Sequence, residues 1–365
     1  MNASINETNQ NLRASRLLMI MAGLLTLSLL AIGMSFGGRE DMDSVYRLPT
    51  TVGTISGPYP CRNLQIFLVH GETQLDERRY ATLSEALEKG LVVVKKTGNV
   101  QELTIENRSK EVSVFLSAGD IVKGGRQDRT VQDDLILPPL SGPVHLRTFC
   151  VESGRWTRRG AEDAMAFSAS SKALSSRQQK VAARYERDQS RVWSSVAHQQ
   201  YMLSDSVSAL AGRPVELRSN ASPSSLQLTL ENKELDAVKK EYLQALKNLI
   251  SGKADVIGFA FAINGEINSA EVYNHKNLFR ALWPKLLDAA ITEAISEYRA
   301  DKKFQPVETL TLKKFFELAF SGSITERSVW QSTSVKTYTT PTTVLFETLA
   351  MDFDKVWIHR SFIKK

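Results

Sequence analysis

The chain has 365 residues, of which 46 are basic and 40 are acidic, and its formal net charge is +6 at pH 7. Because the basic residues are interleaved with many acidic ones, the composition argues against a nucleic-acid-binding protein. The two cysteines exclude a fold stapled by a disulfide framework, and a chain of this length can bury a hydrophobic core without one.

Residues 17–36 form an apolar run without a single charge. A membrane-spanning helix needs about 20 mostly apolar residues, whereas the core of a signal peptide usually has about 7 to 15. The length favours a retained transmembrane helix, while the small-x-small pattern Ala31-Ile32-Gly33 keeps a cleaved signal peptide open. Residues 1–16 would then be a cytoplasmic tail, and residues 37–57 a linker.

The charges that flank the apolar run set its expected orientation. Arg13 and Arg16 precede it, and positive charge marks the cytoplasmic side of a membrane segment. We therefore expect an inner-membrane single-pass protein with a periplasmic body, or a periplasmic protein if the signal is cleaved. A disulfide between Cys61 and Cys150 is permitted in that compartment. The alternative is that both are apolar buried thiols.

The first half of the body is expected to be rich in strands. Thr82 and Glu85 have the spacing of a helix capping box, and Gly90 follows at a suitable place to end a short helix. Runs of apolar and β-branched residues between turn residues predict strands. These runs are residues 64–69, 91–94, 102–105, 112–116, 131–137 and 144–151.

The second half is expected to alternate helices with one hairpin. Residues 157–200 read as a loop and then a helix with a solvated basic face. Asn232 is a plausible cap of an amphipathic helix, and Asn264-Gly265 between two apolar runs predicts a two-residue hairpin turn. Asn274 is the expected cap of a long helix in which Pro284 would produce a kink.

The last part of the body, residues 301–365, predicts a helix at 310–319 followed by strands at 328–338, 344–349 and 356–362. We expect it to form an added hairpin or small sheet beside a domain covering residues 58–300. The predicted fold class is α+β, with a β-rich first half and a helix–hairpin–helix second half. A single transmembrane or signal segment precedes it.

Most well-marked kinds of chemistry are not indicated by the sequence. The five histidines are not spaced as zinc ligands, so no metal site is expected. No phosphate-binding loop, dinucleotide fingerprint or nucleophile elbow occurs, and no cofactor is indicated.

The strongest candidate site is a cluster of glycine, arginine and carboxylate residues after two of the predicted strands. Glycines permit sharp turns, and guanidinium groups match the oxygens of carboxylates and phosphates. The candidate general bases are Glu152 and Asp128. The candidate ligand-binding residues are Gly124, Gly125, Arg126, Gln127, Arg129, Arg155 and Trp156. The alternative is a fully paired ion network that holds two hairpins together, and His145 is a spare acid or base.

Several pieces of the sequence together resemble the bacterial ARG and rhodanese-phosphatase-superfamily-associated protein domain family, over about residues 58–300. The resemblance implies a domain of unknown function with a loose link to ADP-ribose or phosphate metabolism, and it carries over no activity. Its most specific piece is Cys150-Val151-Glu152-x-Gly154-Arg155-Trp156. The other pieces are Thr82-Leu83, Glu85-Ala86-Leu87, residues 112–119, Gly125-x-Gln127-x-Arg129, Gly258, Asn264-Gly265 and Glu271-Val272.

Three functional hypotheses follow. The first is an exported, membrane-anchored domain that binds a small anionic ligand or an envelope protein through the Arg/Glu/Trp cluster. The second is a hydrolase of a phosphate-containing or ADP-ribose-like compound, which requires an open cleft and a carboxylate that arginine does not fully neutralise. The third is a structural or assembly protein of the cell envelope, with a closed and fully paired cluster.

Overall fold

The computed structural model describes residues 53–97, 102–155, 157 and 167–365, and the fold of this part is mixed α+β and rich in strands. The predicted fold class is confirmed at that level. The expected membrane or signal segment, residues 17–36, lies outside the described residues. Within the described ranges, no helix combines the length and the apolar character needed to cross a bilayer.

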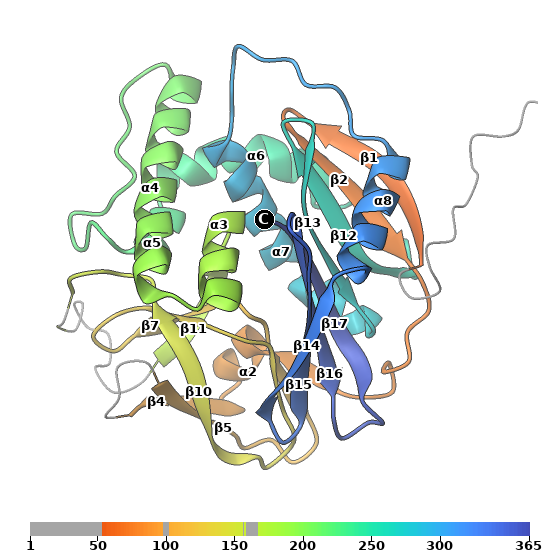
Figure 1. The fold of residues 1–365 in the computed structure, drawn as a ribbon. Helices are drawn as coiled ribbons and strands as arrows, with labels where there is room; N and C mark the ends of the chain where they lie inside the picture. Colours follow the sequence, from red (N-terminus) through yellow and green to blue (C-terminus); the bar gives the residue numbers. More distant parts are fainter. Residues whose placement is uncertain (1–52, 98–101, 156, 158–166) are drawn as a thin grey trace, which may run out of the picture. The chain divides into compact units, whose positions relative to one another are not determined.

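An eight-stranded antiparallel sheet forms the centre of the fold (Figure 1). Its strand order is β1-β2-β12-β13-β17-β16-β15-β14, so the predicted hairpin lies between the first two strands of the body and its last four. The strands are β1 (Thr54–Cys61), β2 (Leu64–His70), β12 (Val256–Ile263), β13 (Glu266–Tyr273), β14 (Ser323–Trp330), β15 (Thr333–Thr339), β16 (Thr343–Ala350) and β17 (Val356–Lys364).

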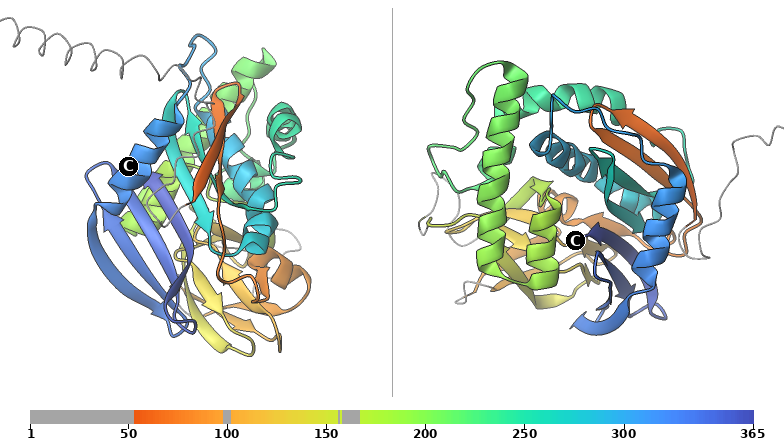
Figure 2. Two further views of the ribbon diagram at one scale, coloured as in Figure 1. Left: turned by 90° about the vertical axis from the view of Figure 1, so that its right-hand side faces the viewer. Right: turned by 45° about the horizontal axis from the view of Figure 1, so that its top comes forward.

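The hairpin β12–β13 forms where the sequence predicts it, because Asn264 and Gly265 both adopt positive φ, 55° and 77°. Every residue of β12 is buried, since both faces of the sheet are covered. On one face Phe259 packs against Phe279 and Trp283 of helix α7 (Lys276–Ser296). On the other, helix α8 (Thr309–Phe320) packs in a second apolar cluster (Figure 2).

The cap of α7 differs from the prediction. Its cap is His275, whose Nδ1 accepts the Leu278 amide at 2.9 Å. Asn274 cannot serve as the cap because its side chain is engaged elsewhere, accepting from Gln74 N at 2.8 Å. Pro284 lies inside the helix without ending it.

The C-terminal strands are not an added small sheet. Strand β17 pairs with β13 through five residue pairs, from Ser269 with Ile363 to Tyr273 with His359, so β14–β17 extend the central sheet. The prediction was wrong because strand partners far apart in sequence leave no local signal. This pairing places His359 and Ser361 beside Glu271 and Tyr273.

A six-stranded sheet, β11-β7-β8-β10-β5-β4, and a three-stranded sheet, β3-β6-β9, make up the other β layer, with α2 (Leu83–Glu88) packed on them. The predicted capping box of Thr82 and Glu85 is present. The strands are β3 (Tyr80–Thr82), β4 (Val92–Lys96), β5 (Glu102–Asn107), β6 (Ser113–Leu116), β7 (Asp120–Gly124), β8 (Arg129–Val131), β9 (Leu135–Leu137), β10 (Gly142–Cys150) and β11 (Phe167–Ala173).

The run 131–137, predicted as one strand, is divided between β8 and β9. Asp133 and Asp134 lie between them, and both contact arginines of other elements. Asp133 contacts Arg327 at 2.7 Å, and Asp134 contacts Arg184 at 2.7 Å. Buried carboxylates need such partners, and this requirement ends the strand.

The part of the chain between β11 and β12 is helical. It contains α3 (Arg177–Lys180), a π-helix η1 (Val181–Glu186), α4 (Gln189–Ala211), α5 (Leu226–Leu230) and α6 (Lys233–Leu246). Asn232 caps α6 as predicted. The basic face expected to be solvated is partly buried, since Arg184 is only 5% exposed and points inward.

Candidate functional site

The predicted Arg/Glu cluster is assembled, and its carboxylates are fully buried. Glu152 accepts hydrogen bonds from Arg155 Nε at 2.6 Å, Ser222 Oγ at 2.5 Å and the Asp128 amide at 3.1 Å. Burial alone would raise the pKa of Glu152, but Arg155 and these donors lower it below its usual value. Glu152 is therefore held as a neutralised anion.

Asp128 is paired in the same way. Its carboxylate accepts from the Gly124 amide and from Ser225 Oγ, each at 3.2 Å, and lies 3.9 Å from the Arg155 guanidinium. Together, Asp128 and Glu152 connect the β7–β8 turn to the loop before α5. The geometry favours the paired-network alternative, since both carboxylates are fully buried among the described residues.

The remaining predicted residues that the structure describes differ in burial and in their contacts. Gly125 adopts φ 58° directly against the Phe167 ring, where a Cβ atom would lie 2.8 Å from the ring. Arg126 is exposed, whereas Gln127 is buried with no hydrogen-bond partner among the described residues. Arg129 is buried beside Cys150. Trp156 lies outside the described residues.

Cys61 and Cys150, for which the sequence left open a disulfide or two buried thiols, are both free thiols in the structure, and Cys61 is only half-buried. Cys150 is buried, and burial raises the pKa of its thiol. His145, the spare acid or base, is exposed on β10 and lies 3.9 Å from Glu102.

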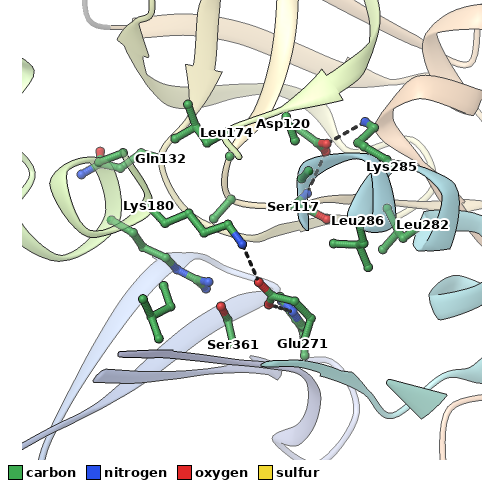
Figure 3. A pocket seen from close by; sticks show the side chains of 18 of the residues that line it. Ser117, Asp120, Gln132, Leu174, Lys180, Glu271, Leu282, Lys285, Leu286 and Ser361 are labelled. Atoms are coloured by element: carbon green, nitrogen blue, oxygen red, sulfur yellow. Dashed lines mark hydrogen bonds and ion pairs between the residues drawn. The ribbon is translucent and has the colours of Figure 1, made fainter. Parts of the chain in front are cut away.

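A largely enclosed pocket lies elsewhere, between the central sheet, α7, η1 and the loop after β6 (Figure 3). The cavity has a volume of about 40 Å³, counted as the space that the centre of a water molecule can reach. This is enough for a few waters or a compact solute. Its charged and polar wall residues come from six separate segments. They are Ser117, Asp120, Gln132, Lys180, Arg184, Glu271, Tyr273, Lys285, His359 and Ser361.

A chain of buried charges forms one wall of this pocket. His359 Nδ1 lies 2.8 Å from Asp134, and its Nε2 lies 3.0 Å from Glu271. Arg184 contacts Asp134 on the far side, and Lys180 contacts Glu271 at 3.2 Å on the pocket side. A ring placed between two carboxylates must carry protons on both nitrogens to donate to both, so this geometry stabilises the imidazolium.

The pKa shifts follow from the same contacts. Burial opposes charge on all three groups, but the opposite charges outweigh it. The pKa of His359 is raised, because Asp134 and Glu271 flank its ring. The pKa of Asp134 is strongly lowered by Arg184 and His359, and that of Glu271 is lowered to about 2 by Lys180 and His359.

Two buried hydroxyl groups in the wall have no hydrogen-bond partner among the described residues. Tyr273 is fully buried and stacks on His359, with ring centroids 4.2 Å apart, and its hydroxyl group is unpaired. The Ser117 hydroxyl lies beside the phenol and lowers its pKa, but neither group makes a hydrogen bond of normal geometry within the described residues. Burial raises the pKa of Tyr273 well above 10, so the phenol is a neutral donor. Buried polar groups are rarely left unsatisfied in native proteins, and each such group calls for a water or a ligand.

The wall offers more donors than acceptors. Within the part of the chain that the structure describes, Lys180 has one hydrogen bond and Lys285 has two, to Asp120 at 2.8 Å and Ser84 at 2.9 Å, although an ammonium group has three donors. The Arg184 Nε group also lacks a partner within the described residues. Such a wall suits a ligand rich in acceptors, such as a carboxylate or phosphate. No group of His, Cys, Asp and Glu side chains suited to a metal ion occurs in the described part of the chain.

The π-helix explains how the cations are presented. In a π-helix one turn is wider than in an α-helix, and such segments are frequent at functional sites. Lys180 precedes η1 and Arg184 lies within it, so both point into the pocket. Arg187 ends the segment in the left-handed conformation, with φ 55°.

Sequence reasoning missed this site because its residues carry no local motif. His359 stands alone in the sequence, and Lys180 and Arg184 look like part of a solvated basic helix. Glu271 falls in one of the pieces that carry the family resemblance, and Ser117 falls in another. Those pieces were the available signal.

Comparison with known proteins gives one match. The family model of the ARG and Rhodanese-Phosphatase-superfamily-associated Protein domain matches residues 54–363. The match therefore extends past residue 300 and includes β14–β17 and the pocket residue His359. No curated protein and no solved structure matches the chain.

Proposed function

We propose that this chain, which belongs to the ARG and Rhodanese-Phosphatase-superfamily-associated Protein domain family, binds a compact anionic ligand in the enclosed pocket. The family is a domain of unknown function. The observation that carries this proposal is the pair of buried, unpartnered hydroxyl groups of Tyr273 and Ser117 beside an ammonium group with spare donors, that of Lys180. Carboxylate or phosphate oxygens would satisfy all three.

The ligand would bind by hydrogen bonds from Tyr273, Ser117 and Lys180, with Arg184 and the imidazolium of His359 adding positive charge behind them. Glu271 would keep Lys180 pointing into the pocket. Bonds to charged groups in a buried site are stronger than those in water. Leu282, Leu286 and Ala289 of α7 supply an apolar side for the rest of the ligand.

The test is thermal unfolding of the full-length protein in detergent with inorganic phosphate, short-chain carboxylates and phosphate monoesters. A ligand at a hundredfold excess over its dissociation constant stabilises the folded state by about 2.7 kcal/mol. The decisive variant is Lys180→Gln, and its matched control is Lys123→Gln. Each lysine contacts a glutamate, at 3.2 and 3.1 Å, but only Lys180 lines the pocket.

We expect one compound to stabilise the wild type and the control equally and Lys180→Gln much less. Equal stabilisation of both variants would show that the compound binds elsewhere. The absence of any stabilising compound in the panel would count against a compact anion as the ligand.

A second candidate function is hydrolysis of a compact phosphate-containing compound in the same pocket. It is favoured by one observation: Glu271 faces the pocket and contacts His359, which also contacts Asp134, so the ring holds this carboxylate in position to orient a water molecule. The assay is release of inorganic phosphate from a panel of phosphate esters. Loss of that activity in Glu271→Gln, with ligand binding retained, would support it, and no release from any ester would reject it.

We also propose that the domain is exported and anchored by residues 17–36. The proposal rests on the uncharged apolar run and on Arg13 and Arg16 before it. Reporter fusions after residue 40 should be active outside the cytoplasm, and activity inside the cytoplasm would refute it. Mass measurement of the mature chain would distinguish an anchor from a cleaved signal.

A further inference from the structure

A serine, a histidine and an aspartate are joined by hydrogen bonds at the edge of the central sheet, outside the enclosed pocket. Ser56 Oγ on β1 lies 2.7 Å from His70 Nε2 at the end of β2. His70 Nδ1 lies 3.0 Å from Asp255 Oδ2, directly before β12. None of the three lines the enclosed pocket. A hydroxyl, an imidazole and a carboxylate in this order form the arrangement that activates a serine as a nucleophile.

The register of three neighbouring strands brings these residues together. In the antiparallel pair of β1 and β2, Thr54 lies opposite His70, and Ser56 follows two residues later on the same face of the sheet. In the pair of β12 and β2, Val256 lies opposite His70, so Asp255 enters the sheet beside the same ring. No local sequence motif therefore marks the three residues.

Asp255 fixes the arrangement of protons on the histidine ring. Partial burial opposes the charge of Asp255, but the hydrogen bond from His70 lowers the pKa of this carboxyl, so it is ionised at neutral pH. A carboxylate can only accept, so the proton of the neutral ring lies on Nδ1. Nε2 is then an acceptor, and the Ser56 hydroxyl donates to it. The ring is thus oriented to remove the proton of the serine.

Tyr59 places a donor beside the nucleophile. Its hydroxyl oxygen lies 3.2 Å from Ser56 Oγ. Since Ser56 donates its own proton to His70, the phenol is the donor in this contact. An oxyanion on a carbon bonded to Ser56 Oγ would lie close to the same phenol, and side-chain donors of this kind stabilise such oxyanions.

The three residues are accessible from solvent. The side chain of Asp255 is 64% exposed and that of His70 is 15% exposed, and Gly57, next to Ser56, is exposed. β1 is the outermost strand of its sheet, so no further strand of the described chain pairs with its outer side (Figure 1). A substrate, and the water needed to complete a hydrolysis, can therefore reach Ser56.

The contacts favour a neutral acyl compound over a phosphate ester. Among the described residues, the side chains hydrogen-bonded to Ser56 and His70 are a phenol and a carboxylate, and neither is a cation. Phosphate groups are bound by arginine, lysine or several backbone amides, and the charge of Asp255 would repel them. Of the acyl compounds, an ester makes the least demand on one uncharged donor, because an alkoxide leaves more readily than an amine.

We propose that Ser56 and His70 are the catalytic residues of a carboxylic-ester hydrolase, with Asp255 positioning the ring. Ser56 Oγ bonds to the carbonyl carbon, its proton passes to His70 Nε2, and the resulting oxyanion accepts a hydrogen bond from Tyr59. The bond from carbon to the alcohol oxygen then breaks, and the alcohol leaves with the proton from His70. Water attacks the acyl-serine by the same steps, which releases the acid and restores Ser56. This site is independent of the pocket and of the ligand proposed for it.

The experiment measures release of p-nitrophenol from p-nitrophenyl acetate by the full-length protein in a detergent that contains no ester. Mass spectrometry then identifies the residue labelled by a fluorophosphonate. Ser56→Ala and His70→Gln should each lower the rate at least about a hundredfold, and the label should be on Ser56.

The matched controls are Ser168→Ala and His145→Gln, which should stay within about twofold of the wild type. Ser168 is an exposed strand serine on β11. His145 also lies beside a carboxylate, Glu102 at 3.9 Å, and it controls for the hydrolysis of this ester by any exposed imidazole. Equal losses in His70→Gln and His145→Gln would show such background hydrolysis and overturn the proposal.

Asp255→Asn tests the positioning role. The asparagine amide can donate to Nδ1, which leaves the ring proton on Nε2, where it blocks transfer from Ser56. We expect a rate at least about tenfold lower near pH 7 and an altered pH profile, and an unchanged profile would contradict the assignment.

Three further results would overturn the proposal. They are labelling of a residue other than Ser56, no hydrolysis by the wild type above the detergent blank, and release of p-nitrophenol from p-nitrophenyl phosphate that depends on Ser56. The last result would assign the serine to phosphoryl transfer.

Discussion

Two buried tyrosines provide a direct comparison between a hydroxyl that stabilises the fold and one that is reserved for a ligand. Tyr242 and Tyr273 are both fully buried. The Tyr242 hydroxyl donates to Asn63 Oδ1 at 2.8 Å, whereas the Tyr273 hydroxyl has no partner among the described residues. Replacing each by phenylalanine removes the same atom from two different environments.

The expected magnitudes follow from these environments. Tyr242→Phe leaves a buried acceptor on Asn63 unsatisfied, which costs about 1 to 3 kcal/mol of unfolding free energy. Tyr273→Phe breaks no hydrogen bond within the described protein and removes an unpaired buried hydroxyl group. We expect it to change stability by less than about 0.5 kcal/mol, or to increase it.

The assay is urea unfolding of the two full-length variants and the wild type in the same detergent, without added ligand. The variants should share the wild-type dependence on urea concentration and differ from each other in unfolding free energy by at least about 0.5 kcal/mol. Tyr273→Phe should also lose most of the stabilisation by the pocket ligand. If it destabilises the protein as much as Tyr242→Phe, the phenol has a structural partner and the reasoning fails.

Further predictions concern the buried charges. Arg155→Ala should destabilise the protein by about 3 to 5 kcal/mol in urea unfolding, because it leaves Glu152 buried without its cation, whereas the exposed Arg126→Ala should stay within about 0.5 kcal/mol. A small effect of Arg155→Ala would contradict the paired network. The pKa of Glu271 is lowered to about 2, so its contribution to stability is present above pH 4.5 and is lost as the pH falls towards 2. Glu271→Gln should therefore make the loss of stability with falling pH shallower in that window. An unchanged steepness would contradict this prediction. The pKa of Glu293 is raised to about 7, so its contribution to the unfolding free energy is present below pH 4.5, and up to about 3 kcal/mol of it is lost as the pH rises to 7. Glu293→Gln should therefore be more stable than the wild type at pH 8 but not at pH 4. Equal stability at pH 8 would argue against a buried charge at this position.

Local features of the fold were predictable from the sequence. The capping box at Thr82, the cap at Asn232 and the turn at Asn264-Gly265 are each specified by residues within a few positions of one another. The apolar runs of β2 and β12 are equally local. The class α+β follows from such elements.

The long-range arrangement was not predictable in the same way. The pairing of β17 with β13 joins residues about ninety positions apart, and no periodicity of one sequence encodes it. The candidate pocket depends on that pairing, because it brings His359 to Glu271. Arg155 and Glu152, by contrast, are only three residues apart, so the sequence indicated them as a candidate site. In the structure the two charges neutralise each other and are buried.

A crystal structure of the protein, purified without replacing any bound small molecule, would test the central claim most directly. The account predicts electron density for an anion in the enclosed pocket, within hydrogen-bonding distance of Tyr273 Oη, Ser117 Oγ and Lys180 Nζ. A pocket closed by side chains, with the Tyr273 hydroxyl donating to another protein group, would contradict the account.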